Sequence, residues 1–349
     1  MRDAPDDGAA GTSSDVTVFA PSPTLTVTVE DNPAGSEIHV HAGGQGVWQA
    51  RMLRRLGVSV TMCCGLTGET GAVLRHLLRD EGVRVVAVER GGRGSAYLHD
   101  RRGGRRVAVA EEEGDPLGRH ELDELYGAML RESASSGVAV LSGPAGDDAL
   151  PADTYRRLAA DLSEGGVRVV VDLAGARMAA ALAGGVDLLK VSDEELRVDG
   201  IVQGTSMREL RAAMRSLRAR GAGTVVVSRA QEPLLLLDGE GFMEVVNPRL
   251  ETADARGAGD SLVAGLVAGI VRGESARRAI TLGAAAGALN VTRHGLGTGD
   301  GETIARLRGS IRTRPLADDP VDAEGLGVSS GVVTPDGLAA LARPEERQP

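Results

Sequence analysis

Short apolar runs alternate with longer stretches of helical periodicity along the middle of this chain. The apolar runs lie at 83–88, 138–143, 167–172, 186–191 and 224–228. They are continuous rather than alternating, which is typical of β-strands that are buried on both faces. Helical periodicity occurs at 72–82, 152–164, 207–220, 259–272 and 276–290. Repeated strand–helix units predict an α/β domain whose mostly parallel sheet is covered by helices on both faces.

Two segments depart from this pattern. Residues 26–44 and 94–112 contain alternating, strand-like runs around turn residues, and these strands are too polar for the middle of the sheet. We expect them to form a small accessory β-sheet. Residues 1–14 are small, polar and acidic, and residues 315–349 are rich in Pro, Gly and Asp. We expect both ends to be disordered, which leaves 15–314 as the folded domain.

Composition narrows the class of protein. The chain has 349 residues, of which 42% are hydrophobic, and a formal net charge of -10. The core is sufficient for a globular protein, and the charge argues against a nucleic-acid or anionic-membrane partner. We find no membrane-spanning run and no signal peptide. Cys63 and Cys64 are adjacent and would point to opposite faces of a strand, so we expect buried free thiols in a cytoplasmic protein.

The stretch RGAGDS (256–261) begins the long apolar helix predicted near 259–272. Gly257, Ala258 and Gly259 leave backbone N–H groups uncovered, and a helix N-terminus adds further N–H groups, so the turn can bind phosphate or a developing oxyanion. A carboxylate there would repel phosphate. Asp260 is therefore explained as a base that removes a proton from a hydroxyl, or alternatively as the N-cap of the helix.

Two motifs resemble the signatures of the ribokinase-like, or PfkB, carbohydrate kinases. DARGAGDS (254–261) resembles D-T-x-G-A-G-D-x, and GGQGVWQA (43–50) resembles G-G-K-G-x-N-x-A. Four further segments follow in family order: GLTGETG (65–71), SGPAG (142–146), KVSDEEL (190–196) and RHGLGTG (293–299). The resemblance covers about 15–310 and is closest to the branch that holds 1-phosphofructokinase and tagatose-6-phosphate kinase. It implies a ribokinase-like three-layer α/β/α domain, with the accessory sheet as a lid.

The resemblance also implies an ATP-dependent kinase that uses Mg²⁺ and phosphorylates a sugar or sugar phosphate. Asp260 matches the family's catalytic base, and 257–259 match its anion hole. Glu195 matches a glutamate that organises Mg²⁺ through water, and Ser192 stands where that element has Asn. The implied substrate-binding residues are Thr24, Gly43, Gly44, Gln45, Trp48 and Arg93, of which Arg93 matches an arginine that contacts the substrate's phosphate. The implied nucleotide-binding residues are Ser228, Ala230, Gly295 and Gly297. The family's lid often pairs with the lid of a second subunit, which implies a homodimer.

Several positions depart from the family pattern. Gln45 replaces the signature lysine, Trp48 replaces its asparagine, and Thr24 stands where a sugar-binding aspartate is expected. The nucleotide loop SRAQEP (228–233) lacks both family glycines. A site that has lost hydrogen-bonding groups discriminates against the former substrate, so we expect an acceptor other than fructose 1-phosphate or tagatose 6-phosphate.

Three interpretations stay open from the sequence. The complete 257–260 turn favours a kinase. The altered loops are also compatible with a sugar- or nucleotide-binding regulator of weakened catalysis, or with a kinase of a nucleoside or another polyol. Trp48 is either a core residue of a helix near 46–56 or a wall of the sugar site.

Overall fold

A ten-stranded β-sheet forms the centre of the computed structural model, which describes residues 15–33, 35–204, 206–248, 256–292, 297 and 299–317. Seven neighbouring strands are parallel: β5 (Arg84–Arg90), β4 (Val60–Thr67), β1 (Val16–Phe19), β8 (Val138–Ser142), β9 (Arg168–Asp172), β10 (Val186–Ser192) and β11 (Ala222–Arg229). Three antiparallel strands extend the sheet beyond β11: β12 (Glu232–Asp238), β13 (Gly241–Val246) and β14 (Arg312–Leu316).

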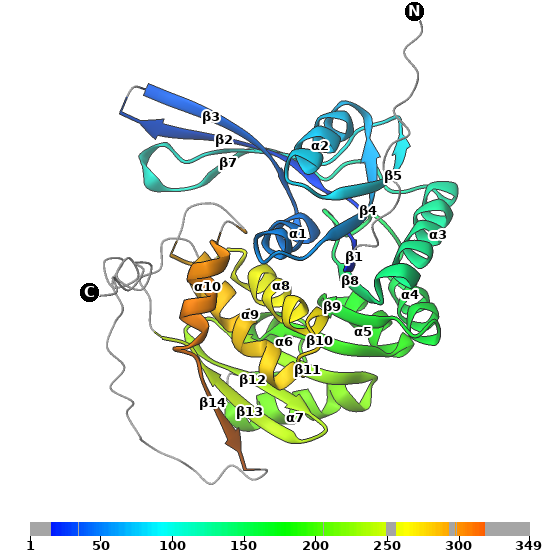
Figure 1. The fold of residues 1–349 in the computed structure, drawn as a ribbon. Coiled ribbons are helices and arrows are strands. Elements are labelled where there is room, and N and C mark those ends of the chain that lie inside the picture. Colours follow the sequence, from blue (N-terminus) through cyan, green and yellow to red (C-terminus); the bar gives the residue numbers. More distant parts are fainter. Residues whose placement is uncertain are drawn as a thin grey trace, which may run out of the picture.

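Helices cover both faces of this sheet, as the strand–helix pattern predicts (Figure 1). One layer contains α1 (Gln45–Arg55), α2 (Gly68–Asp80), α8 (Ala258–Val271), α9 (Ala276–Asn290) and α10 (Gly301–Arg308). The other contains α3 (Arg119–Ser136), α4 (Asp153–Glu164), α5 (Gly175–Gly184), α6 (Asp193–Val198) and α7 (Met207–Ala219). The adjacent thiols of Cys63 and Cys64 are free and buried, and they pack into opposite layers because neighbouring strand residues alternate.

Helix α8 is apolar all round because it is packed between neighbours rather than exposed on one side. It contacts α1 and α9 as well as the sheet. Its approach to α9 is close enough that a Cβ on Gly265 would lie 2.7 Å from the Cα of Gly283. Glycine at these two positions therefore allows backbone-to-backbone packing, which fixes where the N-terminus of α8 lies.

The two polar segments form a separate four-stranded sheet, which we call the lid. Its strand order is β3 (Gly35–Gly43), β2 (Thr24–Asn32), β6 (Ala96–Asp100) and β7 (Val107–Glu112). Figure 1 shows β2, β3 and β7 projecting from the main body. The lid begins two residues before the predicted 26, and β14 continues to Leu316, two residues beyond the predicted domain end. The predicted disorder of 1–14 and of most of 315–349 falls outside the described residues.

The parallel strands β1 and β4, the antiparallel strands β12–β14 and the helices α3, α5, α6 and α10 were absent from the sequence-based prediction. The run EPLLLLD of β12 follows β11 after a two-residue turn, so the two apolar runs read as one region rather than as a hairpin. That turn contains Ala230, which has a φ of 43° and is the only non-glycine residue with positive φ among the described residues.

Replacing Ala230 with glycine is expected to stabilise the protein by about 1 kcal/mol, because an L-residue in the left-handed region pays a steric cost that glycine avoids. Urea denaturation would measure the change. The matched control is Ala212→Gly on the exposed face of α7, which is expected to destabilise by about 1 kcal/mol. Equal destabilisation by both substitutions would contradict the observed turn.

Candidate active site

Polar side chains gather where the parallel strands β8, β9 and β10 end. Binding sites of open α/β sheets lie at this edge, outside the carboxyl ends of the strands. The strand register places Asp172 beside both Ser142 and Lys190, and it places Ser192 beside Ser228. The sheet therefore brings Ser142, Asp172 and Lys190 into one row and places Ser192 and Ser228 two residues further along the same edge.

The RGAGDS turn leads directly into α8. Gly257 is the N-cap residue, has a φ of 67° and accepts a hydrogen bond from the N–H of Ser261 (2.9 Å). Asp260 lies in the first turn of α8 and is 8% exposed. The alternative that Asp260 is the N-cap is therefore wrong, because Gly257 occupies that position and no side chain caps this helix. A buried carboxylate in the first turn lacks a capping role and calls for another explanation.

A buried polar chain connects this turn to the loop after β8. Lys190 Nζ donates to Asp172 Oδ1 (3.0 Å), and the Gln49 amide nitrogen donates to Asp172 Oδ2 (3.0 Å). Ser142 Oγ donates to Gln49 Oε1 (2.6 Å). A Cβ on Gly259 would lie 2.6 Å from Lys190 Nζ, so the ammonium packs directly against the turn. These contacts thus place a cation beside the N-terminal turn of α8, where the helix N–H groups also favour negative charge.

The electrostatics of this cluster affect Asp260 most. Burial and the carboxylate of Asp172 raise the pKa of Asp260 to about 8, although the Lys190 ammonium opposes the shift. Burial alone would lower the pKa of Lys190, but the carboxylates around it outweigh burial and raise that pKa above its usual range. Lys190 is therefore protonated at neutral pH, and Asp260 can exchange a proton near neutral pH.

Ser192 and Glu195 form a capping box at the start of α6. Ser192 donates both its N–H and its hydroxyl to Glu195 Oε2 (2.7 Å each), and Glu195 N–H donates to Ser192 Oγ (3.1 Å). Glu195 Oε1 takes no part in the hydrogen bonds of this capping box. A single carboxylate oxygen outside the capping box suits Mg²⁺, which keeps several waters and takes few protein ligands. Within the described ranges, no three His, Cys, Asp or Glu side chains form a metal-binding group.

The predicted substrate residues line the junction of the lid and α1. Gln45 Oε1 accepts the N–H of Gly143 (2.6 Å), and the Thr24 hydroxyl hydrogen-bonds that of Ser95 (2.8 Å). Gly44 has a φ of 99° at the start of α1, and a Cβ on Gly43 would collide with the lid. These glycines are required by the close turn between β3 and α1.

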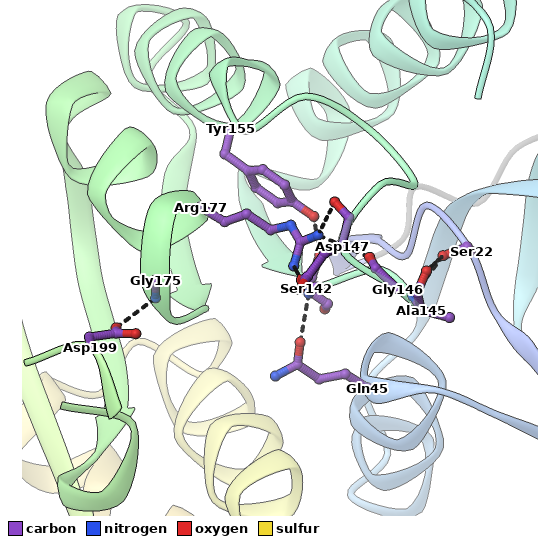
Figure 2. Close-up of polar contacts among 11 residues, drawn as sticks. Ser22, Gln45, Ser142, Ala145, Gly146, Asp147, Tyr155, Gly175, Arg177 and Asp199 are labelled. Carbon is purple, nitrogen blue, oxygen red and sulfur yellow. Dashed lines mark hydrogen bonds and ion pairs between the residues drawn. The ribbon is translucent and has the colours of Figure 1, made fainter. Parts of the chain in front are cut away.

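Gln45 helps to hold the loop after β8, which is anchored from three directions (Figure 2). Ser22 Oγ accepts the N–H of Ala145 (2.8 Å), and the Arg177 guanidinium donates to the carbonyl oxygens of Gly146 (2.9 Å) and Asp147 (2.7 Å). A lysine at position 45 has no acceptor atom and could not make the bond to Gly143. The departure at Gln45 therefore changes how this loop is held as well as removing a charge.

The surroundings of Trp48 and Arg93 differ from those of the other predicted substrate residues. The Trp48 indole is half-buried, and its N–H has no hydrogen-bond partner among the described residues. The Arg93 guanidinium donates to Asp115 Oδ1 (3.0 Å) and lies 3.2 Å from Glu112 Oε1, with 72% of its side chain exposed. Its charge is thus already balanced by two carboxylates at the base of the lid.

The predicted nucleotide residues lie at two places. Ser228 ends the parallel part of β11 and Ala230 follows in the turn. Gly297 packs against the backbone carbonyl of Trp48, where a Cβ would lie 2.8 Å from the oxygen. Gly295 lies outside the described residues.

Comparison with known proteins decides the family. The model described as pfkB family carbohydrate kinase matches residues 13–303. The chain belongs to the pfkB family of carbohydrate kinases. It is accordingly a phosphotransferase that acts on an alcohol group, as the two signatures predict.

Several named relatives of this pfkB-family kinase are phosphofructokinases. It is 30% identical over 259 residues to the ATP-dependent 6-phosphofructokinase isozyme 2 of Escherichia coli K12, covering 72% of this chain and 82% of the relative. It is 29% identical over 294 residues to the 1-phosphofructokinase of Bacillus subtilis 168, covering 80% and 92%. The crystal structure of E. coli phosphofructokinase-2 in complex with potassium matches with a TM-score of 0.76 at 26% identity, covering 85% of this chain and 99% of that one. The predicted ribokinase-like fold is confirmed.

Four residues of the candidate site were missed by the sequence analysis: Lys190 and Asp172 in the strands, Gln49 in α1 and Asn290 in α9. Asn290 is buried, donates to the carbonyl of Arg256 (2.6 Å) and accepts the N–H of Gly297 (3.0 Å), so it joins two loops of the site. Two features of the sequence could have identified these four residues. Lys190 is the only lysine among 39 basic residues, and the other three are polar residues within or at the end of apolar stretches. In the part of the chain that the structure describes, no helix is both long and apolar enough to cross a bilayer.

A pfkB-family kinase that uses Asp260 as its base needs this carboxylate ionised. Because its pKa in the free protein is about 8, kcat/KM for the acceptor is expected to fall roughly tenfold per pH unit below that value. A pH series at constant ionic strength would measure it. A profile that stays flat from pH 6 to 9 would contradict the assignment.

Folding stability gives an independent readout of the same pKa. The unfolded chain loses this proton near pH 4 and the folded chain near pH 8, so ionisable Asp260 makes stability fall as pH rises between these values. The Tm difference between Asp260→Asn and the unmodified protein is therefore expected to become more positive from pH 5 to pH 8.

Proposed function

We propose that this protein transfers the γ-phosphoryl group of ATP to a hydroxyl of a sugar or sugar phosphate, with Mg²⁺. The observation that carries the proposal is the buried Asp260 carboxylate in the first turn of α8, beside the Gly257–Gly259 turn and the Lys190 ammonium. A base next to an anion-binding turn is the arrangement that phosphoryl transfer to a hydroxyl requires.

Asp260 accepts the acceptor's hydroxyl proton as the hydroxyl oxygen forms a bond to the γ-phosphorus and the bond from that phosphorus to the bridging oxygen of ADP breaks. Backbone N–H groups of Gly257, Ala258 and Gly259, together with Lys190, stabilise the negative charge on the transferring group. Mg²⁺, when bound, offsets charge on the phosphates. Glu195, with Ser192 holding its orientation, would bind that ion through water.

The acceptor lies among Thr24, Gly43, Gly44, Gln45, Trp48 and Arg93, and the nucleotide lies along Ser228, Ala230, Gly295 and Gly297. The names of the relatives support a phosphosugar acceptor. Gln45 supports one that differs from theirs, because its amide holds Gly143 where a lysine could not. The buried thiols of Cys63 and Cys64 support a reducing, cytoplasmic location.

Asp260→Asn is expected to lower kcat by about 10²–10⁴-fold, because it keeps the shape of the site and removes the base, while the affinity for ATP changes little. A coupled assay for ADP release would measure turnover with fructose 6-phosphate, other phosphosugars, hexoses and nucleosides as acceptors. Asp123→Asn on the exposed side of α3 is the matched control. No transfer by the unmodified protein to any acceptor would instead favour a binding or regulatory protein.

We also propose that two copies associate through the outer lid face, which consists of Val27, Val29, Ile38, Val40 and Leu98. The strand register places these side chains on one side of the lid, and Ile38 is 67% exposed. Exposed apolar residues near an unpaired edge strand are usually covered by another surface.

Sedimentation velocity at tens of micromolar protein is expected to show a dimer, and Ile38→Glu with Val40→Glu is expected to give a monomer. Val198→Glu, at a still more exposed valine (80%) at the end of α6, is the control and is expected to remain dimeric. A monomer for the unmodified protein would rule out this pairing.

A further inference from the structure

Asn290, the last residue of α9, is a buried polar side chain that the proposed catalytic steps do not use. It is 1% exposed, and both ends of its side-chain amide are hydrogen-bonded. Its Nδ2 donates to the carbonyl oxygen of Arg256 (2.6 Å), and its Oδ1 accepts the N–H of Gly297 (3.0 Å). Both partners are backbone groups outside helices and strands, so this side chain supplies hydrogen bonds that regular secondary structure does not.

Helix α9 also holds the beginning of α8 at a second point. The two helices lie side by side (Figure 1). A Cβ on Gly287 would lie 2.9 Å from the carbonyl oxygen of Ala258. Gly287 and Asn290 are three residues apart in a helix, so they lie on the same face of α9. One face of α9 therefore contacts the RGAGDS turn both before and after Gly257.

The hydrogen bond to Arg256 orients the peptide group that joins Arg256 to Gly257. This peptide is trans, so its C=O and its N–H point in opposite directions. Because Asn290 holds the Arg256 carbonyl toward α9, the N–H of Gly257 points away from that helix. Gly257 is half-buried, which leaves the turn an open side that α9 does not cover.

The backbone at Gly257 makes such a constraint necessary. Its φ of 67° lies in the left-handed region, and glycine adopts positive and negative φ about equally readily. The peptide before this glycine can therefore rotate at little steric cost, and a rotation would exchange the directions of the Arg256 carbonyl and the Gly257 N–H. A hydrogen bond from a buried side chain to that carbonyl opposes the rotation.

The other end of Asn290 connects the same turn to α1. Gly297 has a φ of 68°, and a Cβ there would lie 2.8 Å from the carbonyl oxygen of Trp48. Helix α1 carries Gln45 and Trp48, which are among the predicted acceptor residues. Asn290 thus fixes the turn relative to the helix on which part of the proposed acceptor site is built.

We infer that Asn290 is a positioning residue for phosphoryl transfer, which holds the Arg256–Gly257 peptide so that the Gly257 N–H faces the transferring group. The inference rests on the proposed function, in which the turn 257–259 binds that group. Asn290 acts through the turn and contacts neither substrate. Because negative charge is stabilised most strongly in the transition state, the effect of Asn290 falls on kcat more than on KM for the acceptor.

Asn290→Leu tests this, because leucine has a similar shape and can neither donate nor accept a hydrogen bond. We expect kcat to fall roughly 10–100-fold, less than when an oxyanion-hole donor is deleted outright, and KM for the acceptor to change within about twofold. Asn290→Asp keeps an acceptor for the Gly297 N–H and loses the donor to the Arg256 carbonyl, so it is expected to lower kcat as well. The assay for ADP release, with the acceptors of the previous section, measures both variants.

Leu158→Ala is the matched control for lost stability. Leu158 is fully buried in the opposite helix layer, on α4, so its truncation is expected to lower Tm by an amount comparable to Asn290→Leu. It leaves the RGAGDS turn intact, and kcat is expected to stay unchanged. A loss of kcat in Leu158→Ala as large as in Asn290→Leu would overturn the inference.

Titration calorimetry with ATP and with ADP, in the presence of Mg²⁺ and without acceptor, separates this inference from the kinase proposal. Only ATP carries the γ-phosphoryl group, so Asn290→Leu is expected to weaken binding of ATP more than binding of ADP. That result supports the inference even if no transfer to any acceptor is detected. Equal weakening of ATP and ADP, or unchanged kcat in both Asn290 variants, would overturn it. If the unmodified protein bound no ATP, both proposals would fail.

Discussion

The buried ion pair between Lys190 and Asp172 is the interaction on which the site depends. Both side chains are almost fully buried, and breaking such a pair by removing one partner typically costs about 3–5 kcal/mol. Each member of the pair also acts on a neighbour: Lys190 lies against Gly259, and Asp172 raises the pKa of Asp260. Gln49 completes the hydrogen bonding of Asp172, so α1, β9, β10 and α8 are joined at one point.

In this arrangement the charged side chains of the site set one another's protonation before any ligand binds. Asp260 is held partly protonated by its surroundings, while Lys190 stays charged. A donor phosphate and its cation would change that balance, since new charge next to Lys190 competes with the carboxylates. The ionisation of Asp260 is therefore coupled to what occupies the neighbouring turn, which fits the proposed role of Asp260 as a base that acts once both substrates are bound.

The sequence was sufficient for the architecture because strand burial and helical periodicity are local signals. Continuous apolar runs identified five parallel strands, and polar alternating runs identified the lid. The sequence was not sufficient for β12 and β13, because an antiparallel extension built from apolar strands looks locally like the parallel strands before it. Asp260 and the glycine turn were recognisable from the motif. The partners Gln49 and Asp172 were not, since they are 123 residues apart in sequence and only the folded sheet brings them together.

The lid is a single β-sheet, so its two sides lie close to each other. Its outer side carries Ile38 and Val40, its inner side carries His41 and His99, and a single layer of backbone separates them. In the proposed dimer, formed through the outer lid face, a ligand that contacts one inner side would shift the sheet on which the other subunit rests. Occupancy of one site would then alter the affinity of the other, and by thermodynamic reciprocity the second would act equally on the first. In the proposed lid-paired dimer, a two-sided sheet of this kind would couple the two subunits directly, without any longer route through the protein core.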